Sequence, residues 1–318
     1  MNSKGVSILL KAIDMHIGFI GSGNLALYVA KGLVRSGAIR ASQIIASTPE
    51  TKKATVKEIK QLGVKFTKDN KVTVQESKLL VLAVKPKIIP FVLDELHSFI
   101  TKDHLVVSFA AGVNIASIEK KLQADAKVMR GMTNTCCAVT EGATVYATGK
   151  NATDEDCQVV EQIFGRVGTV EEVEEAHIDA VTGLSGSGPA YAFEAIEALS
   201  DGAVKMGLPR GLALRLGAQS LIGAGRMLLD TGKHPGELKD AICSPEGATI
   251  YALHHLEKGG FRSLLIDAVE ASCCRTRELQ VQGSEEETDQ ESIKRSIREG
   301  MHLKDFLEQN GILKRESG

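Results

Sequence analysis

The sequence predicts an α/β protein in which a doubly wound, mostly parallel sheet is followed by an all-α domain. The first observation is a glycine turn, GSGNLA at 21–26, between a strand-type apolar run at 16–20 and a helix-type run at 25–34. The second is the alternation of strand and helix patterns from there to residue 164, which is typical of doubly wound sheets. The third is that strand patterns stop at about His177, where small and apolar helical runs take over.

Continuous apolar runs indicate strands that are covered on both faces of the sheet. LLVLAV at 79–84 and LVVSF at 105–109 are the clearest examples. The full set of expected strands is 16–20, 43–47, 64–66, 79–84, 105–109, 127–130 and 143–147. The expected helices between them are 25–34, 51–62, 88–99, 114–122 and 154–164, with Asn114 as an N-cap.

The glycine turn reads G-x-G-x-x-A, a pattern that binds a dinucleotide pyrophosphate when it joins a strand to a helix. Gly21 permits the tight turn, Gly23 lets the backbone approach phosphate, and Ala26 lets the helix pack on the strand. The free N–H groups at the helix start then face the anion. A plain structural turn is the alternative for so short a pattern. Small residues and prolines also follow three other strands, at Thr48-Pro49, Ala83–Pro86 and Ala110–Gly112.

The end of the second strand distinguishes the two nicotinamide cofactors. An NAD enzyme presents Asp or Glu there to the ribose 2′-hydroxyl. Here the tip is Ser47-Thr48-Pro49, and Lys52 and Lys53 follow it. Hydroxyls, a helix N-terminus and lysines suit a 2′-phosphate, whereas Glu50 suits the free ribose. NADPH is therefore the preferred prediction, with NADH as the alternative.

The composition argues against several other classes of protein. Of 318 residues, 43% are hydrophobic and 25% charged, and a net charge of −2 does not suit a nucleic-acid binder with a basic face. No run of about 18 apolar residues occurs, so no membrane span is expected. The six cysteines form no C-x-x-C pair, which indicates neither a metal site nor a disulfide framework and favours a reducing compartment. For residues 1–14 three alternatives remain: a short organelle-targeting segment, a disordered start or an added extension.

The second half consists of helical segments rich in small residues. Helices are expected at 189–206, at 211–229, from 249 onward and at 261–279, before a polar tail that starts at 283. The run 211–229 is apolar or small nearly all round, which is typical of a buried helix, so we expect it to pack against another subunit. SPEGAT at 244–249 precedes a helix and offers a second anion site, with a plain helix cap as the alternative.

Several motifs along the chain point to one enzyme family. They are GFIGSGNLA (18–26), LAVKP (82–86), SFAAGV (108–113), MTNT (132–135), EGATVYA (141–147), VTGLSGSGPAY (181–191), DGAVKMGLPR (201–210), HPGELKD (234–240) and SPEGAT (244–249). Together they resemble the pyrroline-5-carboxylate reductases, which reduce 1-pyrroline-5-carboxylate to L-proline. The resemblance covers residue 15 to about 280 and is closest to the animal mitochondrial forms.

The resemblance implies the domain organisation and the assembly. It gives an N-terminal extension at 1–14, a Rossmann-like dinucleotide-binding domain at 15–176, a helical dimerisation and substrate domain at 177–282, and a polar tail at 283–318. The family implies homodimers assembled into pentamers of dimers, and no nucleic-acid partner is expected. It implies NADPH or NADH as cofactor and the last step of proline biosynthesis as the reaction. A mitochondrial location follows from the resemblance, with the cytoplasm as the alternative.

The resemblance also implies the residues of the site. Those for the cofactor are Ile20, Gly21, Ser22, Gly23, Asn24, Leu25, Thr48, Glu50, Asn70, Ala83, Val84, Lys85, Pro86, Phe109, Ala110, Ala111 and Ala241. Those for the substrate are Glu175, Ser244, Gly247, Ala248 and Thr249. Ser244 and the amides of Gly247 and Ala248 would take the substrate carboxylate. No His, Lys or Tyr is obviously placed to protonate the imine, so Thr249 is assigned as its hydrogen-bond partner and proton relay.

Three residues depart from the family pattern. Glu246 stands where the family usually has glycine, beside the expected carboxylate site, where its charge should repel the substrate and its side chain should strain the loop. Cys136-Cys137 replaces a proline-containing continuation, and Ala241 replaces a frequent asparagine. Activity is expected to survive with a raised KM.

Two other functions remain as alternatives at this point. One is a β-hydroxyacid dehydrogenase, for which Lys205 is the only candidate catalytic lysine, although a surface lysine at a helix end explains it as well. The other is a regulatory NADP(H)-binding protein that has lost activity through Glu246 and Ala241.

Overall fold

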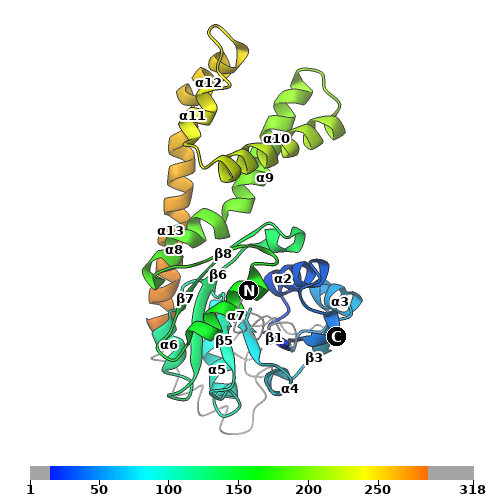
Figure 1. Ribbon diagram of the computed structural model, residues 1–318, viewed down its shortest axis with the longest axis vertical. Helices are drawn as coiled ribbons and strands as arrows, with labels where there is room; N and C mark the ends of the chain where they lie inside the picture. Colours follow the sequence, from blue (N-terminus) through cyan, green and yellow to red (C-terminus); the bar gives the residue numbers. More distant parts are fainter. Residues whose placement is uncertain (1–14, 286–318) are drawn as a thin grey trace, which may run out of the picture. The chain divides into compact units, whose positions relative to one another are not determined.

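The computed structural model describes residues 15–285, which contain one eight-stranded sheet (Figure 1). The strand order is β3-β2-β1-β4-β5-β6-β7-β8. The strands are β1 (Ile17–Ile20), β2 (Ile44–Ser47), β3 (Lys65–Thr67), β4 (Leu79–Leu82), β5 (Leu105–Ser108), β6 (Lys127–Met132), β7 (Gly142–Thr148) and β8 (Gly168–Glu172). The strand order reverses beside β1, which makes this the doubly wound Rossmann-like sheet that the sequence predicts.

All neighbouring strands are parallel except β6 and β7, which are antiparallel. A parallel pair needs a crossover of a dozen or more residues. The connection between β6 and β7 holds only the short helix η3 (Thr135–Val139), so the chain turns back beside itself. The prediction of a mostly parallel sheet is confirmed.

Helices cover both faces of the sheet, and the apolar clusters show which helix lies on which face. Residues of α2 (Asn24–Arg35), α3 (Ala54–Gln61) and α7 (Asp154–Phe164) share one buried cluster with alternate strand residues. The cluster on the opposite face contains residues of α4 (Asn70–Gln75), α5 (Ile89–Leu96), α6 (Ile115–Glu119) and α8 (Ile178–Val181). The central strand β4 is buried along its whole length, as its continuous apolar run predicts.

The strand β8 and the helix α4 are among the elements of the sheet region that the sequence prediction lacks. The strand β8, GTVEE, is partly exposed along its length and carries two glutamates, so it lacks the apolar run of the central strands. The helix α4 has only six residues, too few to show a helical period, and begins where the side chain of Asp69 caps the N–H of Lys71. The helix expected from 51 begins at Ala54, while Asn114 caps α6 by accepting from the Ser117 N–H, as predicted.

The described chain divides into two compact units. Residues 15–186 and 273–285 form the first, which contains the sheet, and Ser187–Ser272 form the second. The sequence places the domain boundary after residue 176, but Ile178 of α8 is fully buried in the apolar core of the first unit. The short helix α8 and the π-helical segment η5 (Thr182–Gly186) therefore belong with the sheet. The expected extension 1–14 and the tail beyond residue 285 lie outside the described residues.

The second unit is helical and leaves much apolar surface exposed. Its helices are α9 (Gly188–Lys205), α10 (Arg210–Thr231), α11 (Pro235–Asp240), α12 (Ala248–Lys258) and the first part of α13 (Phe261–Glu285). On α10 only Ala213 is buried, while Ile222 is 64% and Leu229 73% exposed in the single chain. A soluble monomer rarely exposes so continuous an apolar face, which supports the expected contact with another subunit. No helix within residues 15–285 is long and apolar enough to cross a membrane.

Candidate active site

The carboxyl ends of four neighbouring parallel strands lie level with one another. The strand register pairs Ile20 with both Ser47 and Leu82, and it pairs Leu82 with Ser108. The residues that follow β1, β2, β4 and β5 therefore share one edge of the sheet. Ligands of open α/β sheets bind at this edge, where the strand order reverses.

Gly21 turns the chain at that reversal point. Its φ of +109° lies in the left-handed region, and its N–H donates to the carbonyl oxygen of Ser47 at 2.9 Å. A Cβ atom on Gly21 would come within 2.6 Å of the Ala83 carbonyl oxygen. Glycine is thus required both by the backbone conformation and by the close approach of the β4 end.

The start of α2 is open toward the same edge. Gly23 is its N-cap, no side chain caps the helix, and no acidic residue lies in its first turn. A Cβ on Gly23 would meet nothing within 4 Å. The hydroxyl oxygen of Ser22 is buried without a hydrogen-bond partner among the described residues. Unmet N–H donors, an unpartnered hydroxyl and a positive helix end together fit a pyrophosphate.

The end of β2 carries the residues expected around the adenosine. The Glu50 N–H lies 3.4 Å from Thr48 Oγ1, and the Glu50 carboxylate forms an ion pair with Lys53 at 2.8 Å. Asn70 is buried, and its amide is engaged at both ends. Its Oδ1 accepts from Ser47 Oγ at 2.8 Å, and its Nδ2 donates to Glu95 at 2.9 Å.

The ends of β4 and β5 supply further residues that are expected near the cofactor. Ala83 and Val84 are half-buried, Lys85 is exposed, and Pro86 opens the short helix η2 (Pro86–Ile88). Phe109 is only 5% exposed, and its ring packs edge-on against Phe164 with centroids 5.2 Å apart. Its side chain therefore belongs to the core, and so does that of Ala110, which is only 4% exposed, so the backbone of this segment and the half-buried Ala111 are left to face a ligand.

The loop 244–249 in the second unit forms a turn that leads into α12. The Gly247 N–H donates to the Ser244 carbonyl oxygen at 3.0 Å, which closes a four-residue turn with Pro245 second and Glu246 third. Glu246 has a φ of +57°, so a type II turn is adopted with glutamate at the position that favours glycine. The strain expected at this departure is therefore present.

The turn also determines which amides of this loop are free. Gly247 is expected to offer its N–H to the substrate, but that group is already engaged with Ser244. Gly247 caps α12 without a side-chain hydrogen bond, and the helix starts at Ala248. The first N–H groups of a helix lack partners within it, so those of Ala248 and Thr249 are the open donors. Thr249 is half-buried and Ser244 exposed, while Ala241 is exposed at the end of α11.

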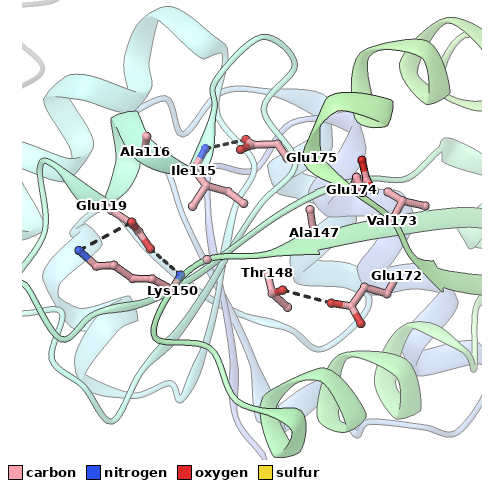
Figure 2. A pocket seen from close by; sticks show the side chains of 11 residues that line it. Ile115, Ala116, Glu119, Ala147, Thr148, Lys150, Glu172, Val173, Glu174 and Glu175 are labelled. Carbon is pink, nitrogen blue, oxygen red and sulfur yellow. Dashed lines mark hydrogen bonds and ion pairs between the residues drawn. The ribbon is translucent and has the colours of Figure 1, made fainter.

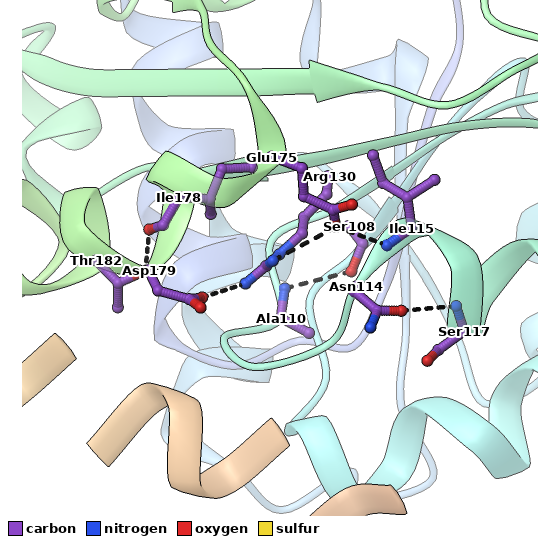
Figure 3. A network of polar contacts seen from close by, with 10 residues as sticks. All are labelled: Ser108, Ala110, Asn114, Ile115, Ser117, Arg130, Glu175, Ile178, Asp179 and Thr182. Carbon is purple, nitrogen blue, oxygen red and sulfur yellow. Dashed lines mark hydrogen bonds and ion pairs between the residues drawn. The ribbon is translucent and has the colours of Figure 1, made fainter. Parts of the chain in front are cut away.

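Glu175 lies at the half-buried end of an ionic network in the first unit (Figure 3). Its carboxylate accepts from the Ile115 N–H at 2.7 Å and lies 3.4 Å from Arg130 Nη1. Arg130 also pairs with Asp179 at 2.6 Å, and its side chain is only 3% exposed. Sequence reasoning missed Arg130, although a charged residue within the apolar strand pattern of β6 was a usable signal. The contacts with the Ile115 N–H and with Arg130 hold Glu175 to the fold.

A hollow of about 630 Å³ lies elsewhere in the first unit, between α6 and the ends of β7 and β8 (Figure 2). Its lining includes Glu119, Glu172, Glu174 and Glu175 against a single lysine, Lys150. Thr148 Oγ1 donates to Glu172 at 3.1 Å, and the Lys150 N–H donates to Glu119 at 3.1 Å. Four carboxylates do not suit an anionic substrate or cofactor. Of the residues expected at the site, Glu175, expected to approach the substrate, lines this hollow, and none of those expected at the cofactor does.

The cysteines form neither a disulfide nor, within the described residues, a metal-binding cluster. All six are free, and the described residues contain no cluster of His, Cys, Asp and Glu that suits a metal ion. Burial raises the pKa of the Cys137 thiol, and Thr133 Oγ1 lies 3.1 Å from its sulfur. Nucleophilic cysteines have a lowered pKa, so the raised pKa of Cys137 suits a packed side chain and not a nucleophile.

Comparisons with known proteins agree with this geometry. The family model described as pyrroline-5-carboxylate reductase dimerisation matches residues 175–279, and the one described as NADP oxidoreductase coenzyme F420-dependent matches 16–112. Pyrroline-5-carboxylate reductase 2 of Bos taurus is 58% identical over 91% of both chains, and that of Homo sapiens 57% over the same shares. The chain belongs to the pyrroline-5-carboxylate reductase family.

Solved structures of this family have the same fold. The pyrroline carboxylate reductase of Plasmodium falciparum, crystallised with NADP bound, is 31% identical and has a TM-score of 0.76 over 84% of this chain and 98% of its own. The enzyme from Coxiella burnetii is 36% identical, with a TM-score of 0.73 over 83% and 98%. The glycine turn and the helical region thus belong to an NAD(P)-dependent oxidoreductase with a dimerisation domain.

Proposed function

We propose that the protein reduces 1-pyrroline-5-carboxylate to L-proline with NADPH or NADH, the last step of proline biosynthesis. The observation that carries this proposal is sequence identity. Over 91% of both chains, 58% of the residues are identical to those of pyrroline-5-carboxylate reductase 2 of Bos taurus. The open start of α2, beside four aligned strand ends, supports the cofactor half of the reaction.

The first unit would hold the dinucleotide. The first N–H groups of α2 and the hydroxyl of Ser22 would take the pyrophosphate, and the loop after β2 would take the adenosine ribose. Backbone of Ala83 to Pro86 and of Phe109 to Ala111 would line the way to the nicotinamide. When bound, NAD(P)H supplies the hydride that reduces the imine carbon of the substrate.

The start of α12 would hold the substrate. The free N–H groups of Ala248 and Thr249, with the exposed hydroxyl of Ser244, form a set of donors for its carboxylate. The loop 244–249 has no His, Lys or Tyr, so the Thr249 hydroxyl is the group that it offers to the ring nitrogen. Thr249 would hold or pass a proton at that nitrogen, because a protonated imine is the better hydride acceptor. Positioning of the reacting carbons would provide most of the rate.

Replacement of Thr249 tests this assignment. Thr249→Ala should lower kcat/KM for pyrroline-5-carboxylate by about 100-fold, the usual contribution of a positioned proton donor, while the NADPH Kd changes less than about twofold. Thr249→Ser, which keeps the hydroxyl, should recover most of the loss. Unchanged turnover in Thr249→Ala would remove Thr249 from the mechanism.

A substrate panel tests the reaction itself against the dehydrogenase alternative. Lys205 is the last residue of α9 and is exposed, which suits a lysine that stabilises a helix end. Without a catalytic lysine there, 2- and 3-hydroxy acids should give no NADP⁺ reduction. NADPH oxidation should proceed with pyrroline-5-carboxylate. Binding of NADPH without turnover of any of these compounds would instead favour a regulatory protein.

We also propose a homodimer, assembled into a pentamer of dimers, in the mitochondrion. The apolar face of α10 supports the dimer, and the resemblance to the animal mitochondrial forms supports the location and the larger assembly. Size-exclusion chromatography with light scattering measures the assembly. A purely monomeric protein would contradict this part of the proposal.

A further inference from the structure

The loop after β2 contains an acid and a base that neutralise each other. Glu50 and Lys53 form an ion pair at 2.8 Å, with their side chains 35% and 42% exposed. The loop that carries them is tied to the sheet edge, because the Thr48 N–H donates to the Thr67 carbonyl oxygen at 3.3 Å. Both charges therefore lie at the strand end that receives the adenosine ribose in doubly wound sheets.

The helix that follows has an open start. Lys53 is the N-cap of α3, no side chain caps this helix, and its first turn contains no acidic residue. The hydroxyl of Thr55 in that turn is buried and has no hydrogen-bond partner among the described residues. Unmet donors and the positive helix end thus accompany the Lys53 ammonium, and the carboxylate that pairs with it comes from Glu50.

Glu95 supplies another carboxylate near this strand end, but its partner is Asn70 and not a lysine. Glu95 accepts from the buried amide of Asn70, which in turn accepts from Ser47. This chain of hydrogen bonds lies beneath the strand end and fixes the Asn70 amide. Glu50, by contrast, is held by one partly exposed ion pair, which is a weak interaction that a stronger anion can replace.

We propose that Glu50 determines cofactor specificity by competing with the 2′-phosphate of NADPH for Lys53. This inference rests on the proposed cofactor site. When the ribose carries a free 2′-hydroxyl, the Glu50 carboxylate accepts from it, as acidic residues at this position do in NAD enzymes. When the ribose carries a 2′-phosphate, Lys53 leaves Glu50 and pairs with the phosphate. The protein can therefore bind both cofactors, and the cost of separating Lys53 from Glu50 reduces its preference for NADPH over NADH.

Binding of two cofactor fragments tests the proposal without turnover. Titration calorimetry at low salt gives the Kd of 2′,5′-ADP and of 5′-AMP, which differ by the 2′-phosphate alone. Glu50→Gln should raise the preference for 2′,5′-ADP over 5′-AMP about fivefold or more, and Lys53→Met should lower it by a similar factor. In the Lys53→Met background, Glu50→Gln should lose the part of its effect that comes from freeing Lys53, and it should keep the part that comes from the 2′-hydroxyl. An unchanged or lowered preference in Glu50→Gln would overturn the proposal.

A matched control separates this local competition from net charge. Lys57→Met lies one turn further along α3, is exposed and removes the same charge as Lys53→Met, so it should leave the preference within about twofold of the unsubstituted protein. An equal effect of Lys57→Met would also overturn the proposal. Failure of the unsubstituted protein to bind either fragment would instead overturn the cofactor site itself. The kcat/KM ratio for NADPH over NADH should shift in the same directions.

Discussion

The starts of α2 and α12 use the same local design in two different surroundings. Each helix has glycine as its N-cap, Gly23 and Gly247, without a side-chain cap and without an acidic residue in the first turn. Gly23 lies in largely buried surroundings within one chain, because Ile20 and Ser22 are buried and three further strands end beside them. Around Gly247 the residues are mostly exposed.

This contrast indicates which half of the candidate site a single chain can complete. An anion at α2 is surrounded by strand ends of the same unit, whereas an anion at α12 faces solvent in the single chain. Dry surroundings strengthen hydrogen bonds to anions. We therefore expect the α12 site to depend on a second copy of the chain and the α2 site to be independent of it.

The largest expected effect comes from breaking the dimer. Ile222→Glu places a carboxylate on the exposed apolar face of α10, and an unpaired charge buried in such an interface costs about 3 kcal/mol or more. The variant should be monomeric by light scattering and should lose pyrroline-5-carboxylate reduction. Its NADPH affinity, measured by calorimetry, should match that of the unsubstituted protein.

Gln61→Glu is the matched control for the dimer variant. Gln61 is exposed on α3 in the first unit, and its replacement adds the same charge. This variant should remain dimeric and active. A monomeric Ile222→Glu protein with full activity would show that the α12 site is complete in one chain.

The next effect concerns the α2 site alone. A methyl group on Gly23 meets no protein atom within 4 Å but would project from the helix start where phosphate must approach. Gly23→Ala should weaken NADPH binding about 30-fold, as expected when charge-assisted hydrogen bonds are lost, with Tm nearly unchanged. Gly21→Ala should lower Tm as well, because its φ is +109° and Ala83 is close. Equal Tm losses in both variants would contradict this distinction.

The smallest expected effect separates charge from strain at the α12 site. Glu246→Gly should lower KM for pyrroline-5-carboxylate about three- to fivefold by removing a negative charge, and should stabilise the protein by about 1 kcal/mol by relieving a positive φ. Glu246→Gln removes the charge and keeps the strained backbone. It should reproduce the lower KM without the gain in stability, as steady-state kinetics and thermal unfolding can show. If KM stays the same in both variants, the charge of Glu246 does not act on the substrate.

Much of the sheet and the glycine turn is predictable because their signals are local. The continuous apolar run of β4 and the spacing of Gly21, Gly23 and Ala26 depend on neighbours along the chain. The antiparallel direction of β7 and the partly exposed strand β8 depend on how distant segments meet, so no local pattern predicts them.

The site residues divide in the same way. Gly21 and Gly23 lie where the sequence predicts, but the burial of the Phe109 ring against Phe164 depends on tertiary packing. The ion pair of Glu50 with Lys53 and the engaged N–H of Gly247 are features of turn geometry, which a sequence motif does not specify. The motif therefore identifies the segment, while the turn decides which of its atoms remain free.

The packing behind α2 has a mechanical consequence. A Cβ on Gly32 would collide with the Cys137 carbonyl oxygen, and a Cβ on Gly142 would collide with the Cys137 sulfur. The far side of the helix thus rests directly on the main chain of the β6–β7 connection, with no compressible side chain between them. Helix and connection are therefore packed without a gap, so a larger side chain at Gly32 or Gly142 would displace one of them from the other.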